Sequence, residues 1–295
     1  MSSAPRQSAF ARGPGFKTWR NRPSSALMPA PPLLFDRALH RKRLDRAARG
    51  FADADFLQRR VAEDIADRLA PIKRDFPLAA NLSARSGALA QALAQTGRVG
   101  RLIEADLSPA MLAGRDGARV VLDEERLPFA HGSLDLAVST LGLHWTNDVV
   151  GALIQIRKAL KPDGLFIGAL LGGSTLTELR QSLVAAESEI LGGAGSRVSP
   201  FADMRDAAGL LDRAGFKQPV ADLDTVSVTY AHPLRLFADL RQMGETNVLA
   251  DRHPRGLSRP LLARTAEIYL ERCGDADGRV PATFEIITLT GWAPT

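Results

Sequence analysis

The feature that most constrains this chain is a stretch between residues 77 and 128 in which apolar segments alternate with polar loops. We predict strands at residues 77–83, 100–105 and 117–122, with a helix over residues 87–95 after the first loop. Acidic residues follow the second and third strands, at Asp106 and Asp123. Strands joined by helices form parallel sheets and end at one edge, so these acids should lie close together. The sequence therefore predicts an open α/β sheet with a ligand site at this edge.

The loop after the first strand, residues 81–87, is the weak part of this pattern. A loop that wraps a ligand usually contains glycines, because backbone N–H groups can then approach the ligand without an intervening Cβ. Here only Gly87 remains, and Ser83 and Arg85 stand where glycines are expected. A left-handed backbone at a non-glycine residue costs on the order of 1 kcal/mol, and we expect the Arg85 side chain to face the ligand. The alternative is an ordinary strand-to-helix turn.

Two acids on neighbouring strands favour an adenosine-bearing ligand over an ordinary turn. Asp106 would accept hydrogen bonds from both ribose hydroxyls, and Asp123 would accept one from the adenine amino group. The alternative is that both acids cap helices or turns. Ser108, followed by Pro109, predicts that a helix begins there. The predicted cofactor contacts are Asn81, Ser83, Arg85, Gly87, Asp106, Leu107, Asp123, Glu124 and Ser139.

The rest of the chain continues the alternation of strands and helices. Further strands are predicted at residues 133–143, 165–171, 220–230 and 280–292, and helices within residues 33–70, 147–160, 175–190, 202–214, 233–243 and 260–272. The near-continuous apolar run at 133–143 is typical of a strand covered on both faces. Thr175 and Glu178 predict a capping box. The predicted fold class is α/β, with a mostly parallel sheet and helices on both faces.

The candidate catalytic residues are His144 and Trp145, which follow the fourth predicted strand. The histidine could act as a general base and the tryptophan could cover the ligand; the alternative is a packed corner with a satisfied histidine. No metal site is predicted, because the histidines are scattered and Cys273 is the single cysteine. Neither a Ser-His-Asp pattern nor a Gly-x-Ser-x-Gly elbow is present.

Positive charge is concentrated in the N-terminal part of the chain. Residues 1–50 contain eleven lysines and arginines against two acids, whereas the whole chain has a net charge of +5, so the remainder is mildly acidic. With an aromatic content of 6%, this argues against a nucleic-acid partner. The basic run at residues 41–49 is interpreted either as a solvated helix face or as a docking surface for an acidic partner.

Residues 1–32 are basic and lack acids, and two interpretations compete. One is a transit peptide, which would place the protein in the mitochondrial matrix. The other is a disordered extension on a bacterial, cytoplasmic protein, and we favour this second interpretation. We predict one domain over residues 33–295, with a cofactor half at 77–171 and a substrate half at 172–295.

Four motifs in the cofactor half resemble those of the class I S-adenosylmethionine-dependent methyltransferases, so the predicted domain is methyltransferase-like. They are Asp-Leu-Ser-Pro-Ala-Met-Leu at 106–112, Leu-Pro-Phe at 127–129, Ser-Leu-Asp-Leu-Ala-Val-Ser at 133–139 and Leu-Lys-Pro-Asp-Gly at 160–164. A second set resembles the mitochondrial complex I assembly factor five family and its bacterial relatives, and lies largely outside that core. It includes residues 35–37, 42–46, 141–148, 168–180, 199–201, 243–247 and 281–284. Around His144 the chain is also similar to the malonyl-carrier-protein methyltransferase of biotin synthesis.

This resemblance implies a seven-stranded sheet with its last strand antiparallel, S-adenosylmethionine as cofactor and a respiratory complex I subunit as protein substrate. It also implies peripheral association with a membrane complex. In the mitochondrial branch the assigned reaction is arginine hydroxylation on the same fold. The chain departs from the family at Asn81, where an acid is expected, and at Ser83 and Arg85, so cofactor binding is expected to be weak.

Three functions remain open from the sequence. The first is an S-adenosylmethionine-dependent methyltransferase acting on a protein. The second is an arginine hydroxylase, or a non-catalytic assembly factor, on the same fold. The third is a small-molecule or acyl-carrier O-methyltransferase. The acceptor residue and the oligomeric state are not determined by the sequence.

Overall fold

The fold is described by a computed structural model, which covers residues 33–253 and 256–295. The predicted N-terminal extension lies outside these described residues. The helices are α1 (Arg37–Ala47), the 3₁₀ helix η1 (Ala48–Asp53), α2 (Phe56–Leu69), α3 (Ala88–Thr96), the 3₁₀ helix η2 (Leu143–Trp145), α4 (Val149–Ala159), α5 (Thr177–Leu191), α6 (Met204–Ala214), α7 (Pro233–Gln242) and α8 (Arg259–Cys273).

Seven strands form one sheet in the order β3-β2-β1-β4-β5-β7-β6. They are β1 (Phe76–Asn81), β2 (Val99–Asp106), β3 (Ala118–Val121), β4 (Leu134–Thr140), β5 (Leu160–Leu171), β6 (Lys217–Tyr230) and β7 (Val280–Trp292). The pairs among β1 to β5 are parallel, whereas β7 is antiparallel to both β5 and β6. The predicted fold class and the antiparallel last strand are both confirmed.

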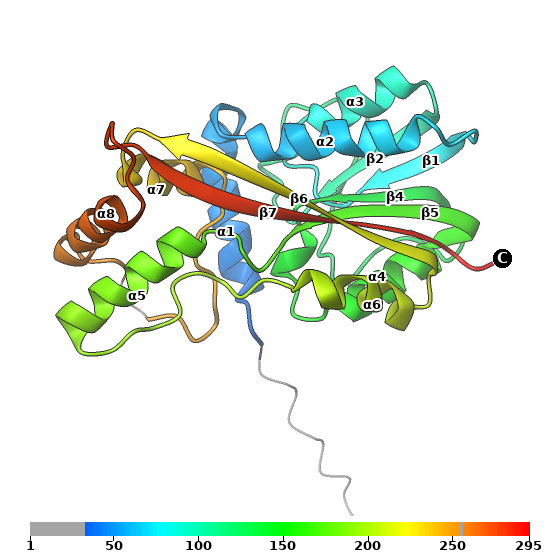
Figure 1. Ribbon diagram of the computed structural model, residues 1–295. Coiled ribbons are helices and arrows are strands. Elements are labelled where there is room, and N and C mark those ends of the chain that lie inside the picture. Colours follow the sequence, from blue (N-terminus) through cyan, green and yellow to red (C-terminus); the bar gives the residue numbers. More distant parts are fainter. Residues whose placement is uncertain (1–32, 254–255) are drawn as a thin grey trace, which may run out of the picture. The chain divides into compact units, whose positions relative to one another are not determined.

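Helices cover both faces of the sheet, as Figure 1 shows, with α2 and α3 on one face and α4 and α6 on the other. Alternate residues of each strand point to opposite faces. In β4, Leu136 and Val138 pack with α2 and α3, whereas Ala137, which lies between them, packs with α4 and α6. Every residue of β4 is buried, which explains why this strand has a continuous apolar run instead of an alternating one.

The remaining helices, α5, α7 and α8, lie beyond the long strands β6 and β7 (Figure 1). Helix α1 lies between these helices and the sheet. This arrangement leaves α1 in contact with the edge where β1 to β4 end, through Leu44 and Ala47, which pack against Leu107 and Met111. Within the described part of the chain, none of the helices is both long and apolar enough to span a bilayer.

The helix predicted after Ser108 does not form. Residues 109–114 make a series of turns, and Gly114 adopts a positive φ of 73°, which ends the helical path after one turn. The Ser108 hydroxyl still accepts a hydrogen bond from the Met111 N–H (3.2 Å), but it donates its own proton to Asp45 of α1 (2.6 Å). The prediction of Ser108 as a cap residue is confirmed, whereas the prediction of a helix after it is wrong.

The capping box predicted at Thr175 and Glu178 is also wrong. Helix α5 begins at Thr177 after Leu176, whose backbone is left-handed. Glu178 turns to β7, where its carboxylate accepts from the N–H and hydroxyl of Thr283. The Thr175 hydroxyl donates to the Glu285 carbonyl oxygen (3.1 Å) and accepts from the Glu285 N–H (3.0 Å). Pairing with a neighbouring strand has replaced the local cap.

Candidate functional site

The carboxyl ends of β1, β2 and β4 bring together polar residues that the sequence placed in a cofactor site. Asn81 lies in register with Glu104 of β2 and Val138 of β4. The hydroxyl oxygens of Ser83 and Ser139 lie 3.0 Å apart. Asn81, Ser83 and Ser139 are fully buried. The predicted convergence of these strand ends is therefore present, although protein atoms cover it.

Asp106, at the end of β2, is a buried carboxylate with only 2% of its surface exposed. One oxygen accepts a hydrogen bond from the Ser108 N–H (2.8 Å), and within the described residues no ion pair neutralises it. Burial raises the pKa of Asp106 to about 7, although Arg85 and the Ser108 N–H oppose this shift. The adjacent Leu107 packs against Leu44 of α1. Ionising Asp106 therefore costs free energy, because its carboxyl group is buried in a site that α1 closes.

The acids after β3 are occupied by an arginine of α1. The Arg37 guanidinium donates to Asp123 (2.8 Å) and to Glu124, and it also donates to the Trp145 carbonyl oxygen (3.2 Å). Burial opposes the charge of Arg37, but the two carboxylates raise its pKa above the ordinary value. The sequence assigned Asp123 to an adenine amino group; here a guanidinium makes the equivalent donation, and the ligand contact stays a prediction.

The 81–87 loop does not carry the backbone strain that we expected. Its non-glycine residues all have negative φ, and Gly87 itself has a φ of −75° at the start of α3. The Arg85 side chain is buried and forms an ion pair with Glu245. Arg85 and Gly87 also line a polar cavity of about 560 Å³ that is bounded by α2, α3 and the 110–115 turn.

Glu245 is the residue that the sequence reasoning missed. Its carboxylate accepts hydrogen bonds from the Arg85 guanidinium and from the Trp145 indole N–H (2.8 Å). It also faces His144 Nε2 (3.3 Å). Burial opposes its ionisation, but Arg85 and His144 hold the pKa of Glu245 below its ordinary value. It lies in the 243–247 motif that carried the family resemblance, so a signal existed, but no chemistry was attached to it.

His144 is held on both sides of its ring. Its Nδ1 accepts from the Leu171 N–H (3.5 Å), so Nε2 carries the proton that faces Glu245. Burial lowers the pKa of His144, although Glu245 opposes the shift. A neutral ring with both nitrogens engaged orients Glu245 and Trp145. This ring could accept a substrate proton only after its hydrogen bond to the Leu171 N–H or to Glu245 breaks. Its role as a base stays a prediction.

Several buried polar atoms in this region have no hydrogen-bond partner among the described residues. They are both ring nitrogens of His40 on α1, Nδ2 of Asn81 and Nε of Arg85. Burial and nearby Arg85 and Arg37 keep the pKa of His40 well below its ordinary value. Unpaired polar atoms inside a protein cost free energy, and several together indicate a place for a polar ligand or water. The atoms, together with Asp106, fit a ligand that has hydroxyl, amino and carboxylate groups.

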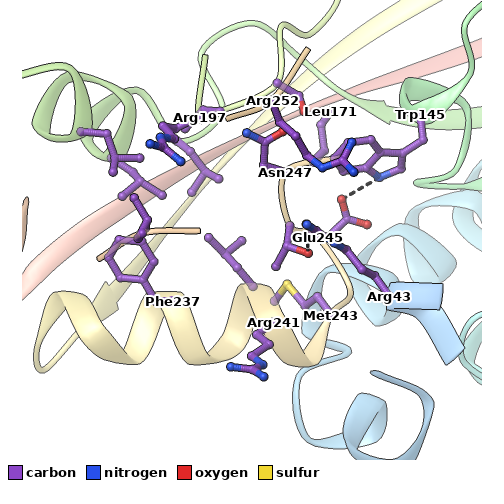
Figure 2. A pocket seen from close by; sticks show the side chains of 18 of the residues that line it. Arg43, Trp145, Leu171, Arg197, Phe237, Arg241, Met243, Glu245, Asn247 and Arg252 are labelled. Carbon is purple, nitrogen blue, oxygen red and sulfur yellow. Dashed lines mark hydrogen bonds between the residues drawn. The ribbon is translucent and has the colours of Figure 1, made fainter. Parts of the chain in front are cut away.

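A second cavity, of about 500 Å³, adjoins this region on the side of α5 and α7. Figure 2 shows it with Trp145 and Leu171 from the sheet edge, Phe237 and Met243 from α7 and the loop after it, and Glu245 near its centre. Glu245 therefore borders this cavity and at the same time binds the loop residue Arg85. No group of three or more His, Cys, Asp or Glu side chains in the described ranges could hold a metal ion.

The sequence comparisons match the chain over most of its length. A family model described as a methyltransferase domain matches residues 81–168. The chain is 40% identical over 285 residues to the arginine-hydroxylase NDUFAF5, mitochondrial, of Danio rerio, covering 94% of this chain and 87% of that protein. It is 33% identical over 282 residues to a malonyl-[acyl-carrier protein] O-methyltransferase of a Methylovorus strain, covering 90% and 92%.

Solved structures show the same fold at low sequence identity. The YcgJ protein of a Bacillus species has a TM-score of 0.52 at 14% identity, over 80% of this chain and 99% of that one. Phosphoethanolamine N-methyltransferase 2 of Haemonchus contortus, in complex with S-adenosyl-L-methionine, has a TM-score of 0.52 at 17% identity, over 87% and 60%. The methyltransferase fold that the motifs predicted is thus confirmed.

Proposed function

Because the chain belongs to the family of the mitochondrial arginine-hydroxylase NDUFAF5, we propose that it is an enzyme that binds S-adenosylmethionine and modifies a side chain of a protein substrate. One observation carries this proposal: Glu245 borders the cavity of about 500 Å³ and also binds Arg85 of the cofactor loop. A substrate side chain in this cavity would therefore lie next to the predicted cofactor site. The proposed substrate is a subunit of respiratory complex I, as the family implies.

The residues at the sheet edge would hold the cofactor as follows. Asp106, in its ionised form, would accept from the ribose hydroxyls. Arg85 and Gly87, which border the polar cavity of about 560 Å³, would face the carboxylate end of the ligand. Asp123 and Glu124 would accept from the adenine amino group once Arg37 has left them. The bound cofactor supplies an activated methyl group, and Glu245 with His144 would orient the acceptor.

Binding requires α1 to move, because α1 supplies most of the cover. Arg37 binds Asp123 and Glu124, His40 packs beside Trp145, and Leu44 packs with Leu107. The neutral Asn81 gives up the charge attraction that an acid would offer to the amino group of the ligand. We therefore propose that binding is weaker than in methyltransferases with a glycine-rich loop.

A second candidate function is O-methylation of an acyl group on a carrier protein. It is favoured by the arginines that line the cavity, Arg43, Arg241 and Arg252 among them, which would attract a carboxylate. The relatives named malonyl-[acyl-carrier protein] O-methyltransferase support the same reading at 33–34% identity.

Calorimetric titration of the purified protein with S-adenosylmethionine tests the cofactor, with Asp106→Ala as the control. Binding that the substitution abolishes supports the proposal, and absence of binding at millimolar ligand would overturn it. Mass spectrometry of a co-expressed complex I subunit then identifies the reaction. A gain of about 14 Da indicates methylation and a gain of about 16 Da indicates hydroxylation. A separate assay supplies S-adenosylmethionine with a labelled methyl group. If malonyl-acyl carrier protein accepts this methyl group and no subunit changes in mass, the second candidate is correct.

A further inference from the structure

The cavity next to Glu245 has an apolar interior. Its walls come from α2, α5, α7, β5 and β7, and they include Leu57, Leu171, Leu179, Leu183, Phe237 and Phe284. Figure 2 shows Phe237 and Met243 facing this space from α7 and the loop after it. An apolar cavity of about 500 Å³ can bury hydrophobic side chains of a ligand and gain free energy from them.

The charged residues around the same cavity are nearly all cations. Its lining includes five arginines, Arg43, Arg46, Arg197, Arg241 and Arg252, and a single acid, Glu245. That acid is already bound by Arg85 and Trp145. Arg197 pairs with Glu187, and Arg252 pairs with Asp36 (3.3 Å). Glu245 therefore cannot neutralise the remaining cations.

Three of the arginines have no acidic partner among the described ion pairs: Arg43, Arg46 and Arg241. Arg43 donates to the Thr246 hydroxyl (2.6 Å), which carries no charge. Burial and the neighbouring Arg252 and Arg46 lower the pKa of Arg43. Like charges held this close repel one another, so an anionic ligand at this place relieves a repulsion that the protein alone retains.

We infer that this cavity and its arginines are the docking surface for an acidic, partly apolar segment of the protein substrate. Apolar side chains of the segment enter the cavity, while its Asp and Glu residues pair with Arg43, Arg46 and Arg241 at the mouth. The inference rests on the proposed function, because it names the kind of segment that carries the modified side chain to Glu245.

Helix α1 extends the positive surface beyond the mouth. Arg41 and Lys42 of α1 and Arg49 of η1 are exposed, so the basic run continues on both sides of Arg46 in the sequence. A nucleic acid would pair with the arginines but would leave the apolar walls unused, whereas an acidic peptide uses both.

The test uses full-length protein and a labelled peptide in which Asp and Leu alternate around one central Arg. The matched peptide has Asn in place of every Asp. Fluorescence anisotropy should show the acidic peptide binding about tenfold more tightly than the Asn peptide, with the difference shrinking at high salt. Equal binding of the two peptides, or no binding of either, overturns the inference.

Charge-reversal variants locate the surface. Arg46→Glu with Arg241→Glu should weaken binding of the acidic peptide about tenfold, and a Lys-for-Asp peptide should then bind more tightly to this variant than to the parent. The control, Arg101→Glu with Arg213→Glu, changes two exposed arginines on other elements and should have no effect. All four positions are exposed, and thermal unfolding of both variants checks the fold.

Two further probes decide between partners, and one measurement separates the two proposals. The first probe is a single-stranded RNA oligonucleotide, and the second is a phosphatidylglycerol vesicle. If either binds more tightly than the acidic peptide, and the Arg46→Glu and Arg241→Glu variant abolishes that binding, the inference of an acidic peptide is overturned in favour of that partner. Titration of the same variants with S-adenosylmethionine reports the proposed function separately. If the parent protein does not bind S-adenosylmethionine but prefers the acidic peptide, the enzyme proposal is refuted and the docking surface stands. If it binds S-adenosylmethionine but does not prefer the acidic peptide, only the docking surface is refuted.

Discussion

The buried carboxylate of Asp106 predicts a specific pH dependence of stability. Burial raises its pKa to about 7, from an ordinary value of 3.8. Between these two pH values the unfolded chain has released the proton while the folded chain still holds it, so folding stability falls as pH rises. At about 1.36 kcal/mol for each pKa unit, the full cost reaches on the order of 4 kcal/mol above pH 7.

The isosteric substitution Asp106→Asn removes this titration. We expect the unfolding free energy of the variant, minus that of the parent, to increase by about 3 kcal/mol between pH 5 and pH 8. Urea unfolding at unit steps of pH measures both proteins, with Asp67→Asn, at an exposed position of α2, as the control for loss of a charge alone. A difference that stays constant over this range would show that Asp106 is ionised at low cost, and the closed site described above would be wrong.

The same titration affects the ligand. Ribose hydroxyls donate hydrogen bonds best to the ionised carboxylate, so below pH 7 the ligand must also drive off a proton from Asp106. We expect the affinity for S-adenosylmethionine to rise up to tenfold for each pH unit below about 7 and to level off above it. Calorimetry in buffers of different ionisation enthalpy should detect the released proton.

Other substitutions test the remaining contacts. Glu245→Gln leaves the buried Arg85 without its acid and should destabilise the protein by about 3–5 kcal/mol, measured by denaturant unfolding; Arg85→Met in the same chain should restore part of this loss. Arg37→Ala removes the guanidinium that binds both acids after β3, so amide hydrogen exchange should accelerate in α1 before it does in the strands. Gly142→Ala should destabilise by about 1–3 kcal/mol, since its Cβ would collide with the Ser83 side chain; unfolding midpoints would show no change if the loop can shift.

The sheet could be predicted because its signals are local. Apolar runs, capping residues and the spacing of strands and helices each follow from a few neighbouring residues, and all seven predicted strands are present. The capping box failed because a distant partner replaced a local one, and the helix after Ser108 failed because the backbone turns at Gly114. Ser108 binds Asp45 of α1, and Glu178 binds Thr283 of β7. A pattern of neighbouring residues cannot contain these contacts.

The candidate site was predicted only in part for the same reason. Ser83 and Ser139 follow and end the neighbouring strands β1 and β4, so their contact follows from the fold. The partners of the acids come from far along the chain: Arg37 lies 86 residues from Asp123, and Arg85 lies 160 residues from Glu245. The sequence showed that acids gather at this edge, but it could not show that the protein neutralises two groups of them with its own arginines.

These two arginines explain why the missing glycines matter less than the loop alone indicates. A buried carboxylate without a partner is costly, and Arg85 and Arg37 remove that cost at Glu245 and at the acids after β3 while no ligand is bound. A ligand that uses the acids after β3 must displace Arg37, which moves α1. The same helix carries Arg43 and Arg46 at the mouth of the neighbouring cavity. A segment that binds these arginines and a cofactor that displaces Arg37 therefore act on one helix, and any change that one makes in the affinity for the other is matched by the same factor in return.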